Sequence, residues 1–223
     1  MTSRELVFGN WTPLFRDPLD VLRRIFVVGA VALAVSGHSG AIPLAVAAAA
    51  VVGVRFLDLP RAFDLAFILA MALTGWGEAL RLYDRFGYYD VFVHFLVPLF
   101  GAPCVYIALA RLDTLPDPVD AYGSKRHLAG IFVVTLALGL AIGAVWEILE
   151  WSADQTFGTE LSLGEQDTIG DLVADGAGAF CGGLFLVAWT VFGWGRCAVS
   201  PGERRAATTR SARTRASQAG RVA

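Results

Sequence analysis

The chain has 223 residues, of which 56% are hydrophobic and 17% are charged, and its formal net charge is −2. A soluble domain carries about 25% charged residues, so this composition, with a mean hydropathy of +0.57, excludes an ordinary water-soluble domain. The apolar runs are continuous and lack the strict alternation of membrane barrel strands, and a helix satisfies its own backbone hydrogen bonds in lipid. We therefore predict an all-α, polytopic membrane bundle.

The first apolar region predicts two short spans joined by a turn. Residues 1–24 are mixed in composition and are expected to form a cytoplasmic or interfacial segment. As a single helix, the run from Ile25 to Phe56 would be about 48 Å long, whereas the hydrocarbon core is about 30 Å thick. The run is broken only at Ser36–Gly40, so a turn at His38 is preferred over one long span.

Four further apolar segments predict four more spans, from about Ala62 to Leu80, Asp90 to Leu112, Leu128 to Trp151 and Thr168 to Trp194. The membrane domain then covers residues 25–195 with six helices, and five is the alternative if the first run is a single span. Residues 196–223 contain seven Arg and one Glu among small residues. This composition predicts a disordered, basic tail.

The basic residues predict the orientation. With six spans and a cytoplasmic N-terminus, cytoplasmic segments hold 16 Lys and Arg and outer segments hold two; five spans give 12 against 6. Because cytoplasmic loops are enriched in these residues, we predict a bacterial inner-membrane protein with both termini in the cytoplasm. The tail is expected to contact anionic lipid, not nucleic acid. Asp64, near the cytoplasmic end of its span, is expected to pair with Arg61 or Arg55.

An acidic stretch from Ala144 to Ala179 holds eight carboxylates and no Lys or Arg between two apolar segments. A charged side chain near the centre of a membrane helix costs about 2.5–3.5 kcal/mol, so a chain that carries several is expected to use them. Under the predicted topology the stretch faces outward. The outer side then holds eleven carboxylates against two arginines, Arg81 and Arg85.

The carboxylates and one histidine form stripes, because residues three or four apart share a helix face. The stripes are Asp90 and His94; Glu147, Glu150 and Asp154; and Asp167, Asp171 and Asp175. Oxygen ligands with one imidazole suit Mg²⁺, Mn²⁺ or Ca²⁺, and Zn²⁺ is compatible. The predicted ligands of a divalent cation are a subset of Asp90, His94, Glu147, Glu150, Asp171 and Asp175.

Two Gly-x-x-x-Gly patterns, Gly139/Gly143 and Gly178/Gly182, predict close packing of the last two spans. If the two patterns face each other, Glu150 lies opposite Asp171, Asp154 opposite Asp167, and Glu147 beside Asp175. Such carboxylates need a shared proton, an arginine or a cation. The aromatic residues at this boundary, Tyr83 and Trp146 among them, are expected to belong to an interfacial belt.

Three functions stay open. The first is an enzyme or metal-binding protein acting on a lipid or cell-envelope substrate, with Glu147 or Glu150 as the candidate general base. The second is proton or cation transport, which needs a polar path that the apolar inner halves of the last three spans do not offer. The third is a structural or partner-binding protein with a proton-sharing carboxylate cluster. Neither enzymatic activity nor the oligomeric state follows from the residues.

Three blocks carry a resemblance to a known family: Asp90-x-x-x-His94-Phe95; Trp146-Glu147-x-x-Glu150-Trp151; and Asp167-Thr168-x-x-Asp171-x-x-x-Asp175 followed by Gly178. Together they resemble the YjdF-like family of uncharacterised bacterial inner-membrane proteins, over roughly Arg61 to Trp194. The resemblance implies a small polytopic helical protein and brings no established reaction. A looser similarity to VanZ-like proteins, associated with glycopeptide-antibiotic resistance, lacks an expected Arg between the last two spans and has Asp175 where Asn is expected.

Overall fold

The computed structural model describes residues 18–57, 59–118, 124–158, 161 and 164–192. Six long helices make up most of this part of the chain: α2 (Pro18–Val35), α3 (Ala41–Val54), α4 (Arg61–Ala79), α6 (Tyr89–Arg111), α7 (Lys125–Phe157) and α8 (Glu165–Val191). The short elements η1 (Arg55–Leu57) and α5 (Leu82–Arg85) lie in the connections. The predicted all-α membrane bundle is confirmed.

Four helices, α4, α6, α7 and α8, are long and apolar enough to cross a membrane, and Ala41–Leu57 is a shorter apolar helix. The predicted break at Ser36–Gly40 is confirmed, because the chain turns there with Gly37 at a φ of +70°. Helix α2 begins at Pro18 rather than Ile25, since its first turns are buried against α3 and α4. Six spans, the inner membrane and cytoplasmic termini stay predictions.

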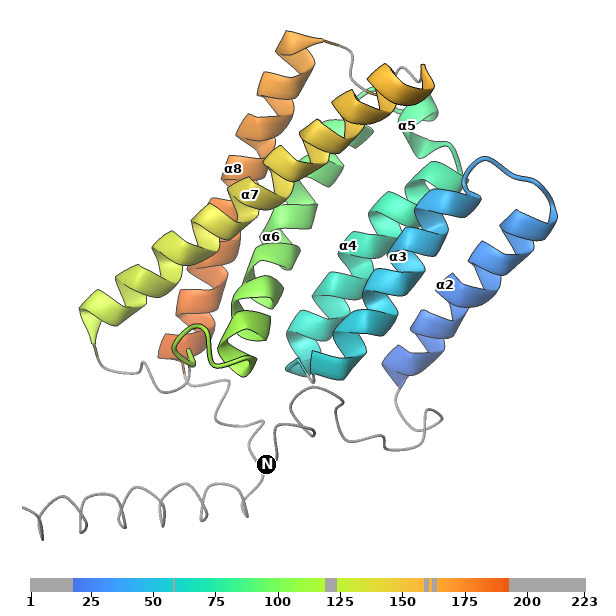
Figure 1. The fold of residues 1–223 in the computed structure, drawn as a ribbon. Helices are drawn as coiled ribbons and strands as arrows, with labels where there is room; N and C mark the ends of the chain where they lie inside the picture. The colour runs from blue at the N-terminus through green and yellow to red at the C-terminus, as the bar shows by residue number, and fades with distance from the viewer. Residues whose placement is uncertain (1–17, 58, 119–123, 159–160, 162–163, 193–223) are drawn as a thin grey trace, which may run out of the picture.

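The long helices alternate in direction, so their connections gather at two ends (Figure 1). The upper end in the figure, here called the acidic end, holds the α2–α3 turn, α5 and the α7–α8 connection. Helices α2, α3 and α4 pack together as one group, and α6, α7 and α8 as another, with α4 against α6 joining them. Three connections distant in sequence therefore lie at the same end of the bundle.

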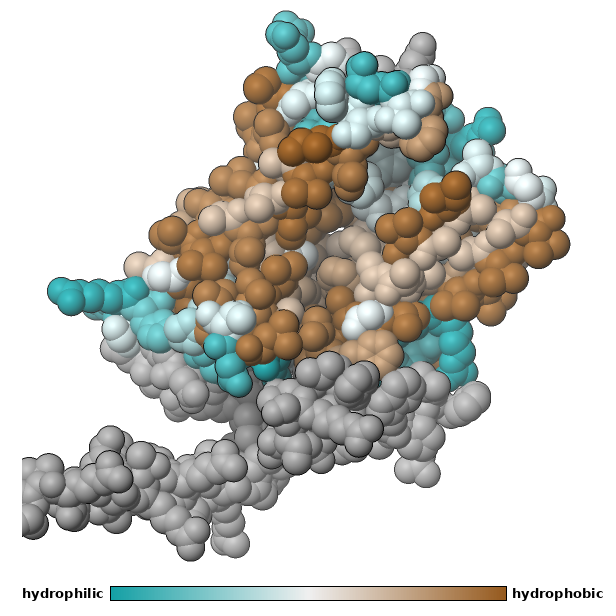
Figure 2. Space-filling view, viewed as in Figure 1, coloured by the Kyte–Doolittle hydropathy of each residue, from teal (hydrophilic) through white to brown (hydrophobic). Residues whose placement is uncertain are grey.

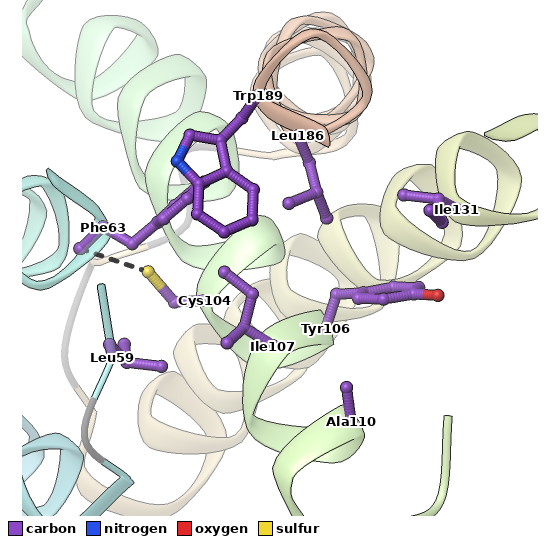
Figure 3. Packing of buried hydrophobic residues seen from close by; sticks show 9 residues of the cluster. All are labelled: Leu59, Phe63, Cys104, Tyr106, Ile107, Ala110, Ile131, Leu186 and Trp189. Atoms are coloured by element: carbon purple, nitrogen blue, oxygen red, sulfur yellow. Dashed lines mark hydrogen bonds between the residues drawn. The ribbon is translucent and has the colours of Figure 1, made fainter. Parts of the chain in front are cut away.

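An apolar core lies between the two groups, toward the end opposite the acidic one. The Phe63 ring of α4 meets the Trp189 ring of α8 edge-on, with 5.2 Å between centroids. The Cys104 thiol of α6 donates a hydrogen bond to the Phe63 carbonyl at 3.3 Å (Figure 3). Ile131 of α7 and Leu186 of α8 belong to the same cluster. Outside, a brown apolar band crosses the helices between teal polar ends (Figure 2).

Small residues allow α6, α7 and α8 to pack closely, but not in the predicted register. A Cβ added at Gly139 would overlap Ala179, and one at Gly143 would overlap the Asp175 carboxylate. Gly178 instead lies against the backbone of α6 at the Phe95 carbonyl.

The prediction that the two glycine patterns face each other is therefore wrong, because each pattern contacts a different helix. Opposed positions on α7 and α8 sum to about 318, as Gly143 and Asp175 do, instead of the predicted 321. Glu147, and not Glu150, then lies at the level of Asp171. The predicted pairs of Glu150 with Asp171 and of Asp154 with Asp167 do not follow from this packing.

A buried ion-pair network joins α2, α3 and α4 near the end opposite the acidic one. The Arg23 guanidinium donates to Asp20 at 2.9 Å, to the Val51 carbonyl at 2.9 Å, and to Asp64. Arg55 donates to the same Asp20 oxygen at 3.0 Å. Asp64 therefore has Arg23 of α2 as its partner, and the Arg55 that the sequence suggested bonds Asp20 instead.

Candidate functional site

His94 is the centre of the acidic end. Its ring is 4% exposed, and Nδ1 lies 3.2 and 3.3 Å from the two carboxylate oxygens of Asp175. Nε2 lies 3.7 Å from Asp90 Oδ1 and 3.7 Å from Glu147 Oε1. Since 3.7 Å is too long for a hydrogen bond, one ring nitrogen is bonded to a carboxylate and the other faces two carboxylates without bonding either.

Each helix positions its own acidic residue. Helix α6 presents Asp90 in its first turn and His94 one turn later. Because Gly143 of α7 lies against Asp175 of α8, the next turn of each helix brings Glu147 and Asp171 to the same level. Glu147, Asp171 and Asp175 are 7%, 2% and 1% exposed. Buried carboxylates of this kind are costly unless they are paired.

Two of these buried carboxylates have an oxygen without a hydrogen-bond partner. Among the described residues, Glu147 Oε1 and Asp171 Oδ1 are fully buried and make no hydrogen bond. Most buried polar atoms in proteins have a partner, so an unsatisfied one requires an explanation. Ligand atoms of Asp90, His94 and Asp171 lie within 4.8 Å of one another, and so do those of His94, Glu147 and Glu150.

The geometry fits a divalent cation. Two ligand atoms that are each about 2.1 Å from one ion lie about 3.0 Å apart at a right angle and about 3.6 Å apart at 120°. The distance from His94 Nε2 to Asp90, in one ligand group, and that to Glu147, in the other, are each close to the second value. A metal-binding histidine usually has its other nitrogen bonded to a carboxylate or carbonyl, and Asp175 occupies that position here.

Comparison with known proteins identifies the family. The sequence profile described as "Predicted membrane protein (DUF2238)" matches residues 22–191, which include every long helix from α3 to α8 and most of α2. The chain belongs to this family. The match confirms the resemblance to YjdF-like membrane proteins, whereas the VanZ-like similarity stays a prediction. No curated protein and no solved structure matches the chain.

Five of the six residues that the sequence of this DUF2238 protein suggested as metal ligands lie around the sixth, His94. The two possible ligand groups each combine His94 with two carboxylates: Asp90 and Asp171 in one, Glu147 and Glu150 in the other. The Asp175 carboxylate is hydrogen-bonded to the other ring nitrogen, Nδ1. The structure thus brings these side chains together.

Some other carboxylates of the acidic stretch bond outside this cluster, and the two outer arginines lie outside the stretch. The Asp154 carboxylate accepts a hydrogen bond from the Leu161 backbone at 2.9 Å, in the connection after α7. Glu160 lies outside the described residues. Arg81 and Arg85 are exposed on and beside α5, and within the described ranges no ion pair joins either to the cluster. Compensation by an arginine, one of the three possibilities that the sequence left open, is therefore not observed there.

Two residues near the cluster, Tyr83 and Trp146, were not assigned to it from the sequence. Burial raises the pKa of the Tyr83 hydroxyl well above its usual range, and the charges of Asp90, Glu78 and Glu150 raise it further. Trp146 donates to Glu150 at 2.7 Å. Tyr83 lies on the short helix α5, for which the sequence contains no recognisable signal, whereas Glu78 lies at the end of α4.

Proposed function

We propose that this DUF2238 protein binds a divalent cation between α6, α7 and α8 and uses it on a lipid or cell-envelope substrate at the outer face of the bacterial inner membrane. The observation that supports this most directly is the environment of His94. One ring nitrogen bonds Asp175, and the other faces Asp90 and Glu147 at 3.7 Å each. The facing Glu147 oxygen is buried and has no hydrogen bond.

Charge balance also supports a cation over a shared proton. Five carboxylates surround one imidazole: Asp90, Glu147, Glu150, Asp171 and Asp175. A proton shared by two carboxylates would join their oxygens at about 2.5–2.7 Å, yet Glu147 Oε1 and Asp171 Oδ1 have no hydrogen-bond partner. A divalent cation in either ligand group would offset two negative charges and would satisfy one of these two oxygens.

The arrangement suits hydrolysis or group transfer at an oxygen-rich centre. A bound cation would polarise a phosphoryl or carbonyl oxygen, or lower the pKa of a bound water. Glu150 is only half-buried and belongs to one ligand group, so it is the candidate general base if the cation lies in the other group, with Glu147 as the alternative. Mg²⁺, Mn²⁺, Ca²⁺ and Zn²⁺ all accept ligands of these kinds.

Ion transport across the bundle is less well supported than a reaction confined to the acidic end. A transported ion would need polar groups between the cluster and the opposite end of the bundle. Along α6, α7 and α8 that region holds buried apolar side chains, among them Ile107, Ile131 and Leu186 (Figure 3). Thr135 is buried there, but its hydroxyl donates to the Ile131 carbonyl of its own helix.

Metal content tests the proposal. Detergent-purified wild type, Glu147→Gln and Asp171→Asn would be compared by elemental mass spectrometry, with Asp154→Asn as the matched control outside the cluster. We expect near-stoichiometric cation in wild type and control and its loss from both cluster variants. A metal-free wild type that takes up none of Mg²⁺, Mn²⁺, Ca²⁺ or Zn²⁺ on dialysis would overturn the proposal and favour a proton-sharing structural cluster.

A further inference from the structure

The two unsatisfied oxygens of the acidic cluster lie on carboxylates of different ligand groups. Asp171 belongs with Asp90 to one group, Glu147 belongs with Glu150 to the other, and His94 is common to both. Asp171 Oδ1 and Glu147 Oε1 are buried without a hydrogen bond in the described part of the chain. Neither group found in those residues contains both carboxylates. One cation therefore satisfies one of these oxygens and leaves the other without a partner.

A proton does not account for the remaining oxygen. A protonated carboxyl oxygen donates a hydrogen bond, and burying a donor without an acceptor is as costly as burying an unpaired acceptor. Asp171 Oδ1 and Glu147 Oε1 have no such partner among the residues that the structure describes. The second oxygen therefore needs a cation for the same reason as the first.

The charge of the cluster also exceeds what one cation offsets. Five carboxylates surround a single imidazole: Asp90, Glu147, Glu150, Asp171 and Asp175. With all five ionised, one divalent cation leaves an excess of three negative charges, whereas two cations leave an excess of one. Because Glu147, Asp171 and Asp175 are buried, water does little to offset that excess. A second cation therefore lowers the repulsion among carboxylates that water does not reach.

The two groups offer a cation different numbers of ligands, because His94 has only one ring nitrogen available. Its Nδ1 is hydrogen-bonded to a carboxylate of α8, so Nε2 alone can bind an ion. Nε2 lies 3.7 Å from Glu147 Oε1, which is itself the unsatisfied oxygen, and both side chains are buried. A cation held there, with Glu150 as third ligand, is well enclosed. The other group then provides two carboxylates, Asp90 and Asp171.

The position between Asp90 and Asp171 keeps ligand places free for a substrate. Magnesium-like ions usually retain several waters and are held by one or two carboxylates together with substrate phosphate. The Asp90 side chain is 36% exposed, so this position can be reached from outside the bundle. Paired cations suit in-line displacement at phosphorus, because one stabilises the attacking oxygen and the other the leaving oxygen.

We propose that the acidic cluster holds two adjacent divalent cations and acts on a phosphate ester. The first is bound by His94, Glu147 and Glu150, and the second by Asp90 and Asp171. In the reaction, a water oxygen bonds to phosphorus as the ester P–O bond breaks. One proton of the water passes to the leaving oxygen and the other stays on the phosphate. This inference rests on the proposed cation site, to which it adds a second ion and a substrate class.

Loading with Mn²⁺ alone tests the second cation. Full-length wild type, Asp90→Asn and Glu150→Gln would be dialysed to saturation against Mn²⁺ and the bound metal counted by elemental mass spectrometry. The control is Asp154→Asn, because Asp154 bonds the Leu161 backbone outside the cluster. We expect about two Mn²⁺ per chain in wild type and control and about one in each cluster variant, which keeps one group intact.

Electron paramagnetic resonance of the same samples tests whether the ions are neighbours. Cations of a two-metal site lie about 3.5–4 Å apart, so two Mn²⁺ ions should be magnetically coupled in wild type and control. Each cluster variant should give the signal of an isolated ion. Saturation is needed because one group alone, with two or three protein ligands, is expected to lose its ion during purification and to refill only in excess metal.

The number of ions in wild type separates this inference from the proposed function. One Mn²⁺ per chain, or two without magnetic coupling, would overturn the second cation while the proposed cation site stands. No bound Mn²⁺ would overturn the inference, and the proposed function falls with it if Mg²⁺, Ca²⁺ and Zn²⁺ are not taken up either. A coupled pair that persists in both cluster variants would overturn the assignment to these groups. The wild-type result requires no substitution, so the test does not depend on how well a variant folds.

Discussion

The two ends of the bundle each bury a cluster of charged side chains, and the clusters differ in balance. Near one end, Asp20 and Asp64 meet Arg23 and Arg55, so two carboxylates face two guanidinium groups. At the acidic end, five carboxylates surround a single imidazole. Burial is similar at both ends: Asp20 is 2% exposed, as is Asp171. Burial alone therefore does not identify a functional site.

The difference teaches that unsatisfied charge, and not buried charge, points to a ligand. In the Arg23 network, donors and acceptors meet at 2.9–3.0 Å and join three helices. A structural role, holding three helices together, is sufficient to explain this network. In the acidic cluster, two buried oxygens have no partner in the described part of the chain, which supports the proposed cation.

Breaking the balanced network should have the largest effect on stability. Arg23→Met leaves Asp20 and Asp64 buried without this guanidinium, and removing one partner of a buried ion pair costs about 3–5 kcal/mol. The melting temperature in detergent should fall sharply, whereas Arg85→Met, on the exposed helix α5, should change it little. Equal melting of Arg23→Met and wild type would remove the distinction between the two ends.

Cation addition should stabilise only the unbalanced cluster. A ligand at one hundred times its Kd stabilises the folded state by about 2.7 kcal/mol, so the wild-type melting temperature should rise when the cation replaces EDTA. Asp171→Asn should show no such rise. In EDTA it should melt at or above the wild-type temperature, because a buried uncompensated carboxylate is removed. A variant less stable than wild type in EDTA would argue that Asp171 is structural.

A methyl group at Gly143 should disturb the site more than one at Gly139. Both Gly→Ala changes overpack the α7–α8 contact, which costs about 1–3 kcal/mol. Only Gly143→Ala displaces the Asp175 carboxylate that bonds His94, since Gly139 lies against Ala179. Cation affinity, measured by titration calorimetry, should fall for Gly143→Ala and be nearly retained for Gly139→Ala. Equal affinities would exclude Asp175 as the residue that orients His94.

The smallest expected effect is the pH dependence of stability that Tyr83 contributes near the cluster. The pKa of Tyr83 is raised above its ordinary value of 10.0, chiefly by burial and then by nearby negative charge. Above that value the unfolded chain releases the proton and the folded chain keeps it, so stability contributed by Tyr83 is present below about pH 10 and lost as the pH rises.

Melting temperatures measured from about pH 9 to about pH 11 would test this. Wild type should lose stability relative to Tyr83→Phe by about 1 kcal/mol or less. Tyr88→Phe is the control, because Tyr88 is 69% exposed. Parallel curves for wild type and Tyr83→Phe would place Tyr83 in ordinary solvent and away from the three carboxylates.

Much of the fold could be predicted because it depends on local composition. Continuous apolar runs predict helices in lipid, and the observed starts of α4 and α6, Arg61 and Tyr89, lie next to the predicted ones. Helical spacing likewise placed Asp90 and His94 on one face. The pairing of Asp64 could not be predicted in this way, because Arg23 reaches it from a helix distant in sequence.

The sequence by itself determined which side chains each helix presents together, since the helical repeat is a local property of the backbone. Only the tertiary structure decided which faces meet. Small residues permit close approach to any partner, so the Gly178 pattern packs against α6 where α7 was predicted. That choice shifted the register of α7 and α8 by about one helical turn. It placed Asp175 on one side of His94 and left a buried Glu147 oxygen unsatisfied on the other.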